Sequence, residues 1–240
     1  MESDADWDVR IKDIMPNFAR GVKEVIDWPF DVPHHTQDPR ITPYGDSWDV
    51  LWMGHCGASH EGNVRSYVFN DTSVPPVDRE YILDTGLQWD QHPPGTRSVY
   101  QFSRATCSTA YAISLEGAKK LVNYFRETNY NIDIQLSKVC TEEVDMMCLS
   151  VWPQIITPAV TESNIDHADS GSSPDSDHEN RLTYISPGPG LQFSARVNAK
   201  GVLEEGVRKE GWIPQWNTSW VEVDGMWGMV EVNASTIDIT

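Results

Sequence analysis

The sequence predicts an α/β fold, and three stretches carry that prediction. Apolar residues between Ile11 and Ile26 recur at steps of three and four, which is the spacing of one helix face. Residues 48–53, Trp-Asp-Val-Leu-Trp-Met, form a short apolar run that ends at Gly54 and is typical of a buried strand running into a glycine turn. Residues 114–125 return to the helical spacing. Helix and strand patterns in one chain of this length indicate helices packed on a sheet.

Composition limits the kinds of partner that the protein can have. A chain of 240 residues with 39% hydrophobic residues and 10 tryptophans can build a substantial core. Its formal net charge of -18 argues against binding to nucleic acid or to anionic membrane surfaces, because both reward clustered Lys and Arg. No apolar run approaches the ~20 residues of a membrane-spanning helix.

Signals for cellular location are sparse. Met1 is followed by an acidic segment, so we expect no signal peptide in this stretch. Three Asn-x-Ser/Thr triplets, at Asn70, Asn217 and Asn233, would matter only in the secretory pathway.

The chain opens with a cluster of carboxylates. Glu2, Asp4, Asp6 and Asp8 fall within seven positions. In an extended segment Asp4 and Asp6 point to the same side, because side chains alternate along a strand. Two carboxylates side by side suit a small divalent cation that also binds water and substrate phosphates. The alternative is a solvated terminus without a ligand.

The first half of the chain predicts one helix followed by two strands. We expect the helix over 11–26 to kink at Pro16, which can serve as the first residue of a second helical segment. A loop over 30–47 then precedes the strand at 48–53, and a weaker strand is expected at 65–69. Residues 70–97 are rich in Pro, Asp and Gly and predict a long loop of the kind that often binds ligands.

The next segments predict strands around two helices. Ser114 can cap the first helix, and Glu116 complements its positive N-terminal end. The predicted apolar face of this helix consists of Leu115, Ala118, Leu121, Val122 and Phe125. A second helix is expected over 131–139, and strands are expected over 98–102, 107–113, 148–151 and 154–157.

Composition changes from Ala159 onward and suggests three regions: a domain over 1–158, an acidic Ser-rich linker over 159–182 and a Trp-rich extension over 183–240. We expect an irregular extension with weak strands at 191–197 and 226–232. Packing is the commoner use of its tryptophans, although stacking on sugars is the alternative.

The four cysteines are Cys56, Cys107, Cys140 and Cys148. No pair has the Cys-x-x-Cys spacing of a structural zinc site. Buried thiols in a reducing compartment and disulfides in an oxidising lumen are both compatible with the sequence.

Several of these motifs, taken in order, resemble a known family. The acidic segment is followed by a helix, by Trp-Asp-Val-Leu-Trp-Met-Gly-His-Cys-Gly at 48–57 and by Ala-Tyr-Ala-Ile-Ser-Leu-Glu-Gly-Ala-Lys-Lys-Leu at 110–121. Asn-Ile-Asp-Ile-Gln-Leu follows at 131–136. This series resembles glycosyltransferase family 25, which includes lipopolysaccharide and collagen galactosyltransferases, and above all its fungal branch. The resemblance covers roughly residues 2 to 157.

The resemblance implies the C-terminal part of a GT-A-like (Rossmann-like) domain with a mixed sheet. It implies transfer of a hexose, most often galactose, from a UDP-sugar donor to a glycan or protein acceptor with the help of Mn²⁺ (or Mg²⁺). Asp4 and Asp6 would then bind the metal. Asp133 matches the family's Ile-Asp-x-x-Leu segment and would act as base on the acceptor hydroxyl or orient that hydroxyl. The alternative is an Asp that merely favours a helix N-terminus. His55 would line the cofactor site, or else be a turn histidine without a catalytic part.

The sequence departs from the family pattern in two places. Ser3 stands where the family usually has a third acid. The family's strands that hold the nucleotide base precede the acidic motif, whereas almost nothing precedes it here. Two hypotheses follow: the chain is the later part of a longer transferase of the ER or Golgi lumen, or it is a non-catalytic remnant that serves as a binding or structural module. A metal-dependent hydrolase is a third.

Overall fold

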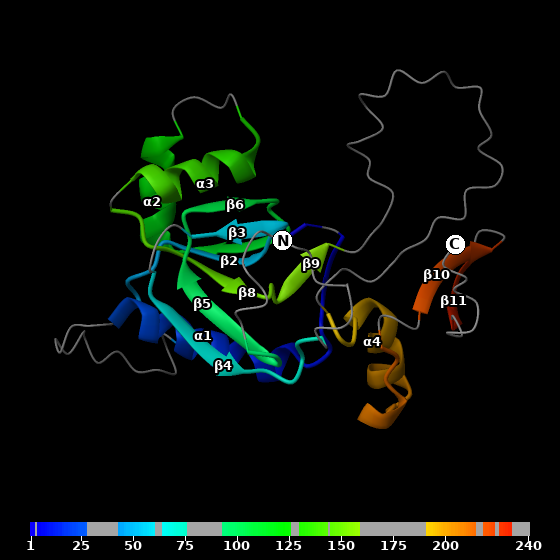
Figure 1. Ribbon diagram of the computed structural model, residues 1–240. Coiled ribbons are helices and arrows are strands. Elements are labelled where there is room, and N and C mark those ends of the chain that lie inside the picture. Colours follow the sequence, from blue (N-terminus) through cyan, green and yellow to red (C-terminus); the bar gives the residue numbers. More distant parts are fainter. Residues whose placement is uncertain are drawn as a thin grey trace, which may run out of the picture.

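A five-stranded mixed β-sheet forms the centre of the protein (Figure 1). The computed structural model describes residues 1–2, 4–27, 43–60, 64–75, 93–125, 130–143, 145–158 and 191–214, and the backbone of 218–223 and 226–231. Helices pack on this sheet, which confirms the predicted α/β class. The linker expected at 159–182 and most of the two loops expected at 30–47 and 70–97 lie outside the described residues.

The strands of the central sheet lie in the order β4-β5-β8-β2-β7. β2 and β8 are parallel, and the other neighbours are antiparallel. All five were expected from the sequence, with boundaries that differ by up to three residues. Their bounds are β2 (Val50–Gly54), β4 (Ser66–Asn70), β5 (Thr96–Gln101), β7 (Ala110–Ile113) and β8 (Cys148–Trp152).

Helices cover both faces of this sheet (Figure 1). α1 (Ile11–Asp27) lies on one face, and α2 (Leu115–Tyr124) and α3 (Ile132–Glu142) lie on the other. Because side chains alternate along each strand, the core consists of two clusters, one on each face of the sheet. Val50 and Trp52 pack with α2 and α3, whereas Leu51 packs with α1. Because β2 is buried on both faces, its sequence is apolar throughout.

α1 is one helix that runs through Pro16, so the two helical segments expected there are a single element. On its apolar face Phe18 and Val22 are fully buried, and Ile11, Met15 and Ile26 are partly buried. Gly21 lets it approach the sheet closely, because a Cβ at this position would lie 2.7 Å from Cγ2 of Val99. The packing of this face on the sheet outweighs the loss of one backbone hydrogen bond at proline.

α2 begins as predicted but buries only part of its predicted face. The Ser114 hydroxyl accepts a hydrogen bond from the Gly117 N–H at 2.9 Å and caps the helix. Gly117 and Leu121 face the core, and a Cβ on Gly117 would overlap the backbone of Asp49. Leu115 and Val122, by contrast, are 73% and 77% exposed, so their assignment to the buried face was wrong.

Two short ladders extend the structure beyond the central sheet. β1 (Ala5–Trp7) pairs with β9 (Ile156–Pro158), and β3 (Gly57–Ser59) pairs with β6 (Arg104–Thr106), both in antiparallel fashion. β9 corresponds to the strand expected at 154–157. No helix among the described residues is long and apolar enough to cross a membrane.

The extension contains a helix where a strand was expected. The prediction of a strand at 191–197 is wrong, because α4 (Ala195–Glu204) starts within it and is capped by the Ser194 hydroxyl. A single 3-10 turn follows at Lys209–Gly211. The strand expected at 226–232 is confirmed as β11 (Met226–Glu231), which pairs with β10 (Thr218–Val223).

The four cysteines form two disulfides, Cys56–Cys107 and Cys140–Cys148. The structure therefore selects the disulfide alternative over buried thiols. Cys140–Cys148 joins the end of α3 to the start of β8.

Candidate functional site

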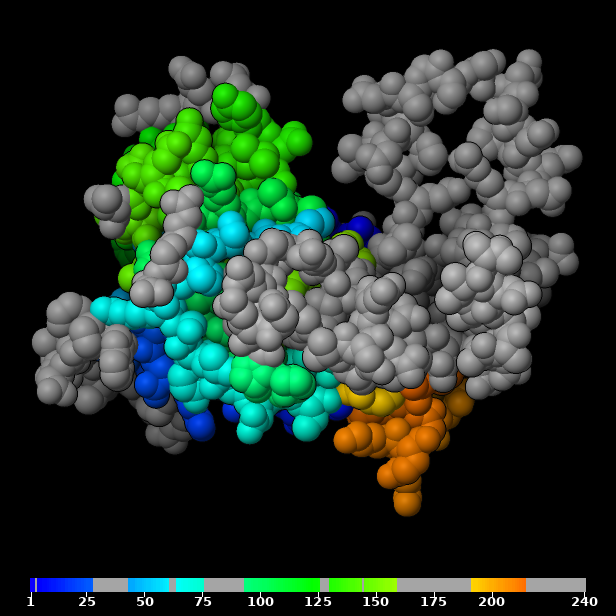
Figure 2. All heavy atoms as spheres, viewed as in Figure 1, coloured from blue at the N-terminus to red at the C-terminus, as the bar shows by residue number. Residues whose placement is uncertain are grey.

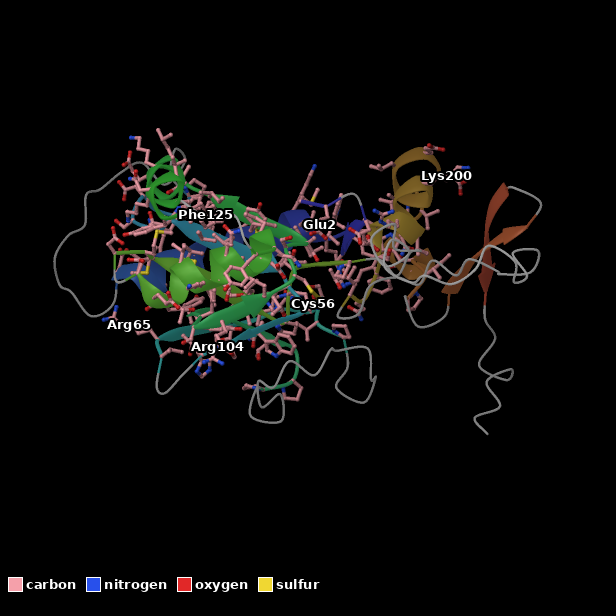
Figure 3. The ribbon with its side chains drawn as sticks, turned by 90° about the horizontal axis from the view of Figure 1, so that it is seen from above. Glu2, Cys56, Arg65, Arg104, Phe125 and Lys200 are labelled. Carbon is pink, nitrogen blue, oxygen red and sulfur yellow. A yellow bond between two sulfur atoms is a disulfide. The ribbon has the colours of Figure 1, made fainter. Side chains whose placement is uncertain are left out.

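The parallel strands β2 and β8 end at the same edge of the sheet. His55 follows β2 directly, and Gln154 lies two residues beyond β8. Glu2 and Cys56 lie toward this end, which is nearer α4, whereas Arg65 and Phe125 lie toward the other end (Figure 3). In open α/β sheets, ligands bind at the carboxyl ends of parallel strands.

The acidic opening segment and Asp133 meet at one loop, residues 107–109, on this edge. The Glu2 N–H donates to the Thr109 carbonyl at 2.9 Å, and the Ser108 hydroxyl donates to Oε1 of Glu2 at 2.7 Å. On the other side of the loop, the Cys107 N–H donates to Oδ2 of Asp133 at 2.9 Å. Segments more than a hundred residues apart in the sequence are thus joined through three consecutive residues.

Cys107 fixes this loop to the end of β2. It forms the disulfide with Cys56, and its carbonyl accepts a hydrogen bond from the Trp52 indole N–H at 2.9 Å. Its backbone has a φ of 61°, which is uncommon for a residue other than glycine. The covalent bond and the hydrogen bonds together hold Cys107 in that conformation.

Asp133 lies in the first turn of α3 and is half-buried. Its Oδ1 accepts a hydrogen bond from the Ile134 N–H at 2.8 Å while Oδ2 binds the Cys107 N–H. The carboxylate therefore both favours the helix N-terminus and holds the 107–109 loop. It is placed at the same edge of the sheet as the acidic segment.

Asp6 is fully buried, and donors surround its carboxylate. Oδ1 accepts from the Trp7 N–H at 2.8 Å and from the Arg196 N–H at 3.2 Å, and Oδ2 accepts from the Ser194 hydroxyl. Burial raises the pKa of the Asp6 carboxyl, and these hydrogen bonds only partly offset that effect. Asp6 therefore binds the segment that leads into α4.

Asp4 differs from Asp6 in its surroundings. It is partly exposed and makes no side-chain hydrogen bond or ion pair within the described part of the chain. Asp4 and the exposed Glu2 suit a hard divalent cation as oxygen donors, whereas both oxygens of Asp6 are already engaged. Among the residues that the structure describes, no group of three or more His, Cys, Asp or Glu could hold a metal ion. Of the two predicted metal ligands, Asp4 has carboxylate oxygens available to a metal ion, whereas those of Asp6 accept hydrogen bonds from the protein.

His55 is fully buried at the end of β2. Its Nε2 lies 3.0 Å from the Val151 carbonyl, and its ring stacks on Trp152 with centroids 6.1 Å apart. Its Nδ1 has no hydrogen-bond partner among the described residues. Burial lowers the pKa of His55 to about 4, although the hydrogen bond to Val151 opposes this effect. The imidazole is therefore neutral at pH 7, with one ring nitrogen as a hydrogen-bond donor and the other as an acceptor.

Two further polar side chains near this edge are buried without partners. Within the described part of the chain, neither polar atom of the Gln154 side chain makes a hydrogen bond, and neither does the hydroxyl of Thr157. Thr157 lies opposite Asp6 in the β1–β9 ladder. Neither residue was singled out from the sequence, because an isolated Gln or Thr beside a strand carries no pattern.

The sequence also gave no sign of Arg97, which fixes the turn that carries Gln154. Arg97 is fully buried, forms an ion pair with Asp71 and donates hydrogen bonds to the carbonyls of Pro153 and Gln154, the latter at 2.8 Å. Burial alone would raise the pKa of the Asp71 carboxyl, but Arg97 and the hydrogen bonds from Ser73 lower it. A lone Arg in a strand is normally solvated, so only the tertiary contacts reveal this role.

In comparisons with protein-family models, with curated proteins and with solved structures, no match to the chain was found.

Proposed function

We propose that this protein is the catalytic part of a metal-dependent glycosyltransferase with a GT-A-like fold. It would transfer a hexose, with galactose as the first candidate, from a UDP-sugar to a hydroxyl group of a glycan or protein. The observation that supports this most is the convergence of the acidic segment and Asp133 on the 107–109 loop at the carboxyl edge of the sheet. The sequence resemblance predicts these same two segments as metal site and base.

The proposal gives each carboxylate a distinct role. Asp4 would bind a divalent cation, Mn²⁺ or Mg²⁺, which when bound offsets the negative charge on the leaving diphosphate. Asp133 would accept the proton of the acceptor hydroxyl or orient that hydroxyl. The sequence pairs Asp6 with Asp4 as a ligand, but its hydrogen bonds to Ser194 and Arg196 favour a role in orienting the segment that carries Asp4.

His55 would fix the position of the loop that lines the binding site of the UDP-sugar donor. A neutral imidazole held against Val151 and Trp152 gives the loop after β2 a fixed position. The adjoining Cys56–Cys107 disulfide joins that loop to the 107–109 loop. The two disulfides also support the proposal that the transferase works in the oxidising lumen of the ER or Golgi.

The test is calorimetric titration of UDP into the chain with and without Mn²⁺. We expect binding only with Mn²⁺, and a loss of affinity of about 10-fold or more in Asp4→Asn. Glu204→Gln, an exposed carboxylate on α4, is the matched control and should bind as the native chain does. Equal UDP affinity with and without Mn²⁺, or an unchanged affinity in Asp4→Asn, would contradict the metal assignment.

A non-catalytic binding or structural module is the second candidate. It is favoured by the engagement of both Asp6 oxygens and by Ser3 in place of an acid. This candidate predicts that the chain binds neither UDP nor Mn²⁺. A metal-dependent hydrolase would bind both and release free sugar with water as the sole acceptor, which product analysis detects.

A further inference from the structure

The triplet Asn70-Asp71-Thr72 has the Asn-x-Thr pattern of an N-glycosylation acceptor. Asn70 is the last residue of β4, which is an edge strand of the central sheet. Side chains alternate along β4, so Phe69 is only 8% exposed while Asn70 is exposed to solvent. The strand lies at the surface of the molecule, as the cyan atoms in Figure 2 show.

The fold turns the middle residue of the triplet inward and the other two outward. The buried Asp71 forms the ion pair with Arg97, and its Oδ1 accepts a hydrogen bond from the Ser73 N–H at 2.8 Å. Thr72 is exposed, and its carbonyl accepts a hydrogen bond from Arg10 at 3.1 Å. Both residues are exposed, and among the residues that the structure describes neither the Asn70 amide nor the Thr72 hydroxyl makes a hydrogen bond.

The cysteines provide a separate observation about the compartment. All four are paired in the two disulfides. Structural disulfides form and persist in oxidising compartments such as the ER lumen. N-glycosylation takes place in that same compartment, where a triplet of this kind is functional.

We propose that Asn70 is a site of N-glycosylation. The co-reactant is a lipid-diphosphate-linked oligosaccharide. A bond forms between Nδ2 of Asn70 and the anomeric carbon, the bond from that carbon to the diphosphate oxygen breaks, and the lipid diphosphate leaves with the electron pair while the amide loses one proton. This inference does not rest on the proposed transferase activity, and either can fail without the other.

A glycan at this position fits the surroundings of β4. It would extend from the end of β4, which pairs only with β5 among the described strands and on which Val68 is 45% exposed. Open edges tend to pair with other chains unless something covers them. A bulky polar group there covers the edge without displacing a packed side chain.

The test is expression of the full chain behind a cleavable leader in a eukaryotic secretory host, followed by mass spectrometry of both the secreted and the retained lumenal protein. Trypsin releases residues 66–79 as one peptide, which contains Asn70 and no other acceptor triplet. Digestion with a peptide N-glycosidase in ¹⁸O water should convert Asn70 to labelled Asp. Asn217 and Asn233 fall in the separate peptide 210–240 and do not interfere.

Two substitutions of Thr72 provide matched controls. Thr72→Ala removes the acceptor pattern, keeps Asn70 and should abolish the label, whereas Thr72→Ser keeps the hydroxyl and should retain the label. An unmodified 66–79 peptide in native chain whose disulfides have formed would overturn the proposal. Label that persists in Thr72→Ala would overturn it as well.

Discussion

Asp4 and Asp6 are chemically identical residues two positions apart, and burial separates their roles. Asp6 lies in β1 and is buried against Ser194 and the start of α4, while Asp4 is partly exposed to solvent. A carboxylate without water must obtain hydrogen bonds from protein donors or become neutral. The Ser194 and Arg196 donors therefore account for the buried position of Asp6, whereas no described residue donates a hydrogen bond to the Asp4 side chain.

Asp6→Asn and Asp6→Ala should differ in stability. Asn can accept from the backbone N–H groups and donate to Ser194, so the free energy of unfolding at pH 7 should change little. Ala leaves the Ser194 hydroxyl and the Arg196 N–H without their acceptor, which costs about 1–3 kcal/mol. Urea unfolding of the native chain and both variants measures this. Equal losses in the two variants would mean that the carboxylate charge matters more than its hydrogen bonds.

His55 should make the stability depend on pH between its two pKa values. Its folded pKa is about 4, and its ordinary value is 6.5. In that interval the unfolded chain binds a proton that the folded chain does not, so the free energy of unfolding falls as pH falls, by at most about 3 kcal/mol. The measurement is urea unfolding at pH 7 and at pH 5.

A non-titrating variant isolates this contribution. His55→Gln should reduce the difference between pH 7 and pH 5 relative to the native chain. The same pH dependence in His55→Gln as in the native chain would show that other groups cause it.

At the scale of elements, α2 shows that an apolar residue on a helix need not lie on the buried face. Leu121 is in the core, while its neighbour Val122 is 77% exposed. We expect Leu121→Ala to lower the free energy of unfolding by about 2–5 kcal/mol, because it leaves a cavity. Val122→Ala should change it by no more than about 0.5 kcal/mol. Comparable losses in urea unfolding would mean that α2 packs on a different face.

The two disulfides should contribute unequally to stability. Cys56–Cys107 spans 51 residues and Cys140–Cys148 spans 8. Loop-closure entropy in the unfolded chain then gives about 4 kcal/mol for the first and about 2.5 kcal/mol for the second. Replacing each pair by two alanines and measuring urea unfolding tests the order. A larger loss from the short-range pair would indicate that the packing of buried Cys140 and Cys148 dominates.

At the scale of the whole molecule, the extension is tied to the start of the chain. Asp8 forms a two-point ion pair with Arg10, with both contacts at 2.7 Å, and accepts the Phe193 N–H at 3.0 Å. Arg10 also donates to Gln192 at 2.7 Å and lies over the Phe193 ring. Residues 191–198 therefore contribute to the same folded unit as β1, although composition placed them in a separate region.

Asp8→Asn should weaken this connection. It leaves the buried Arg10 guanidinium without its charge partner, which costs about 3–5 kcal/mol. Amide hydrogen exchange at Phe193 and Ser194 should accelerate as well. Lys119→Met, which breaks the exposed pair with Glu116, should cost no more than about 1 kcal/mol. Unchanged exchange at Phe193 in Asp8→Asn would show that other contacts hold the segment.

The sequence by itself determined the α/β class, the five central strands, the Ser114 cap and the β11 strand, because each depends on local spacing or on one side chain next to a backbone group. It did not predict α4, whose capping residue Ser194 also donates a hydrogen bond to the distant Asp6. The different surroundings of Asp4 and Asp6, the pairing of the cysteines and the buried Arg97 were decided by the tertiary structure alone. Each of these features arises from contacts between residues far apart in the chain. The spacing of neighbouring residues does not show which distant groups will pack together and exclude water.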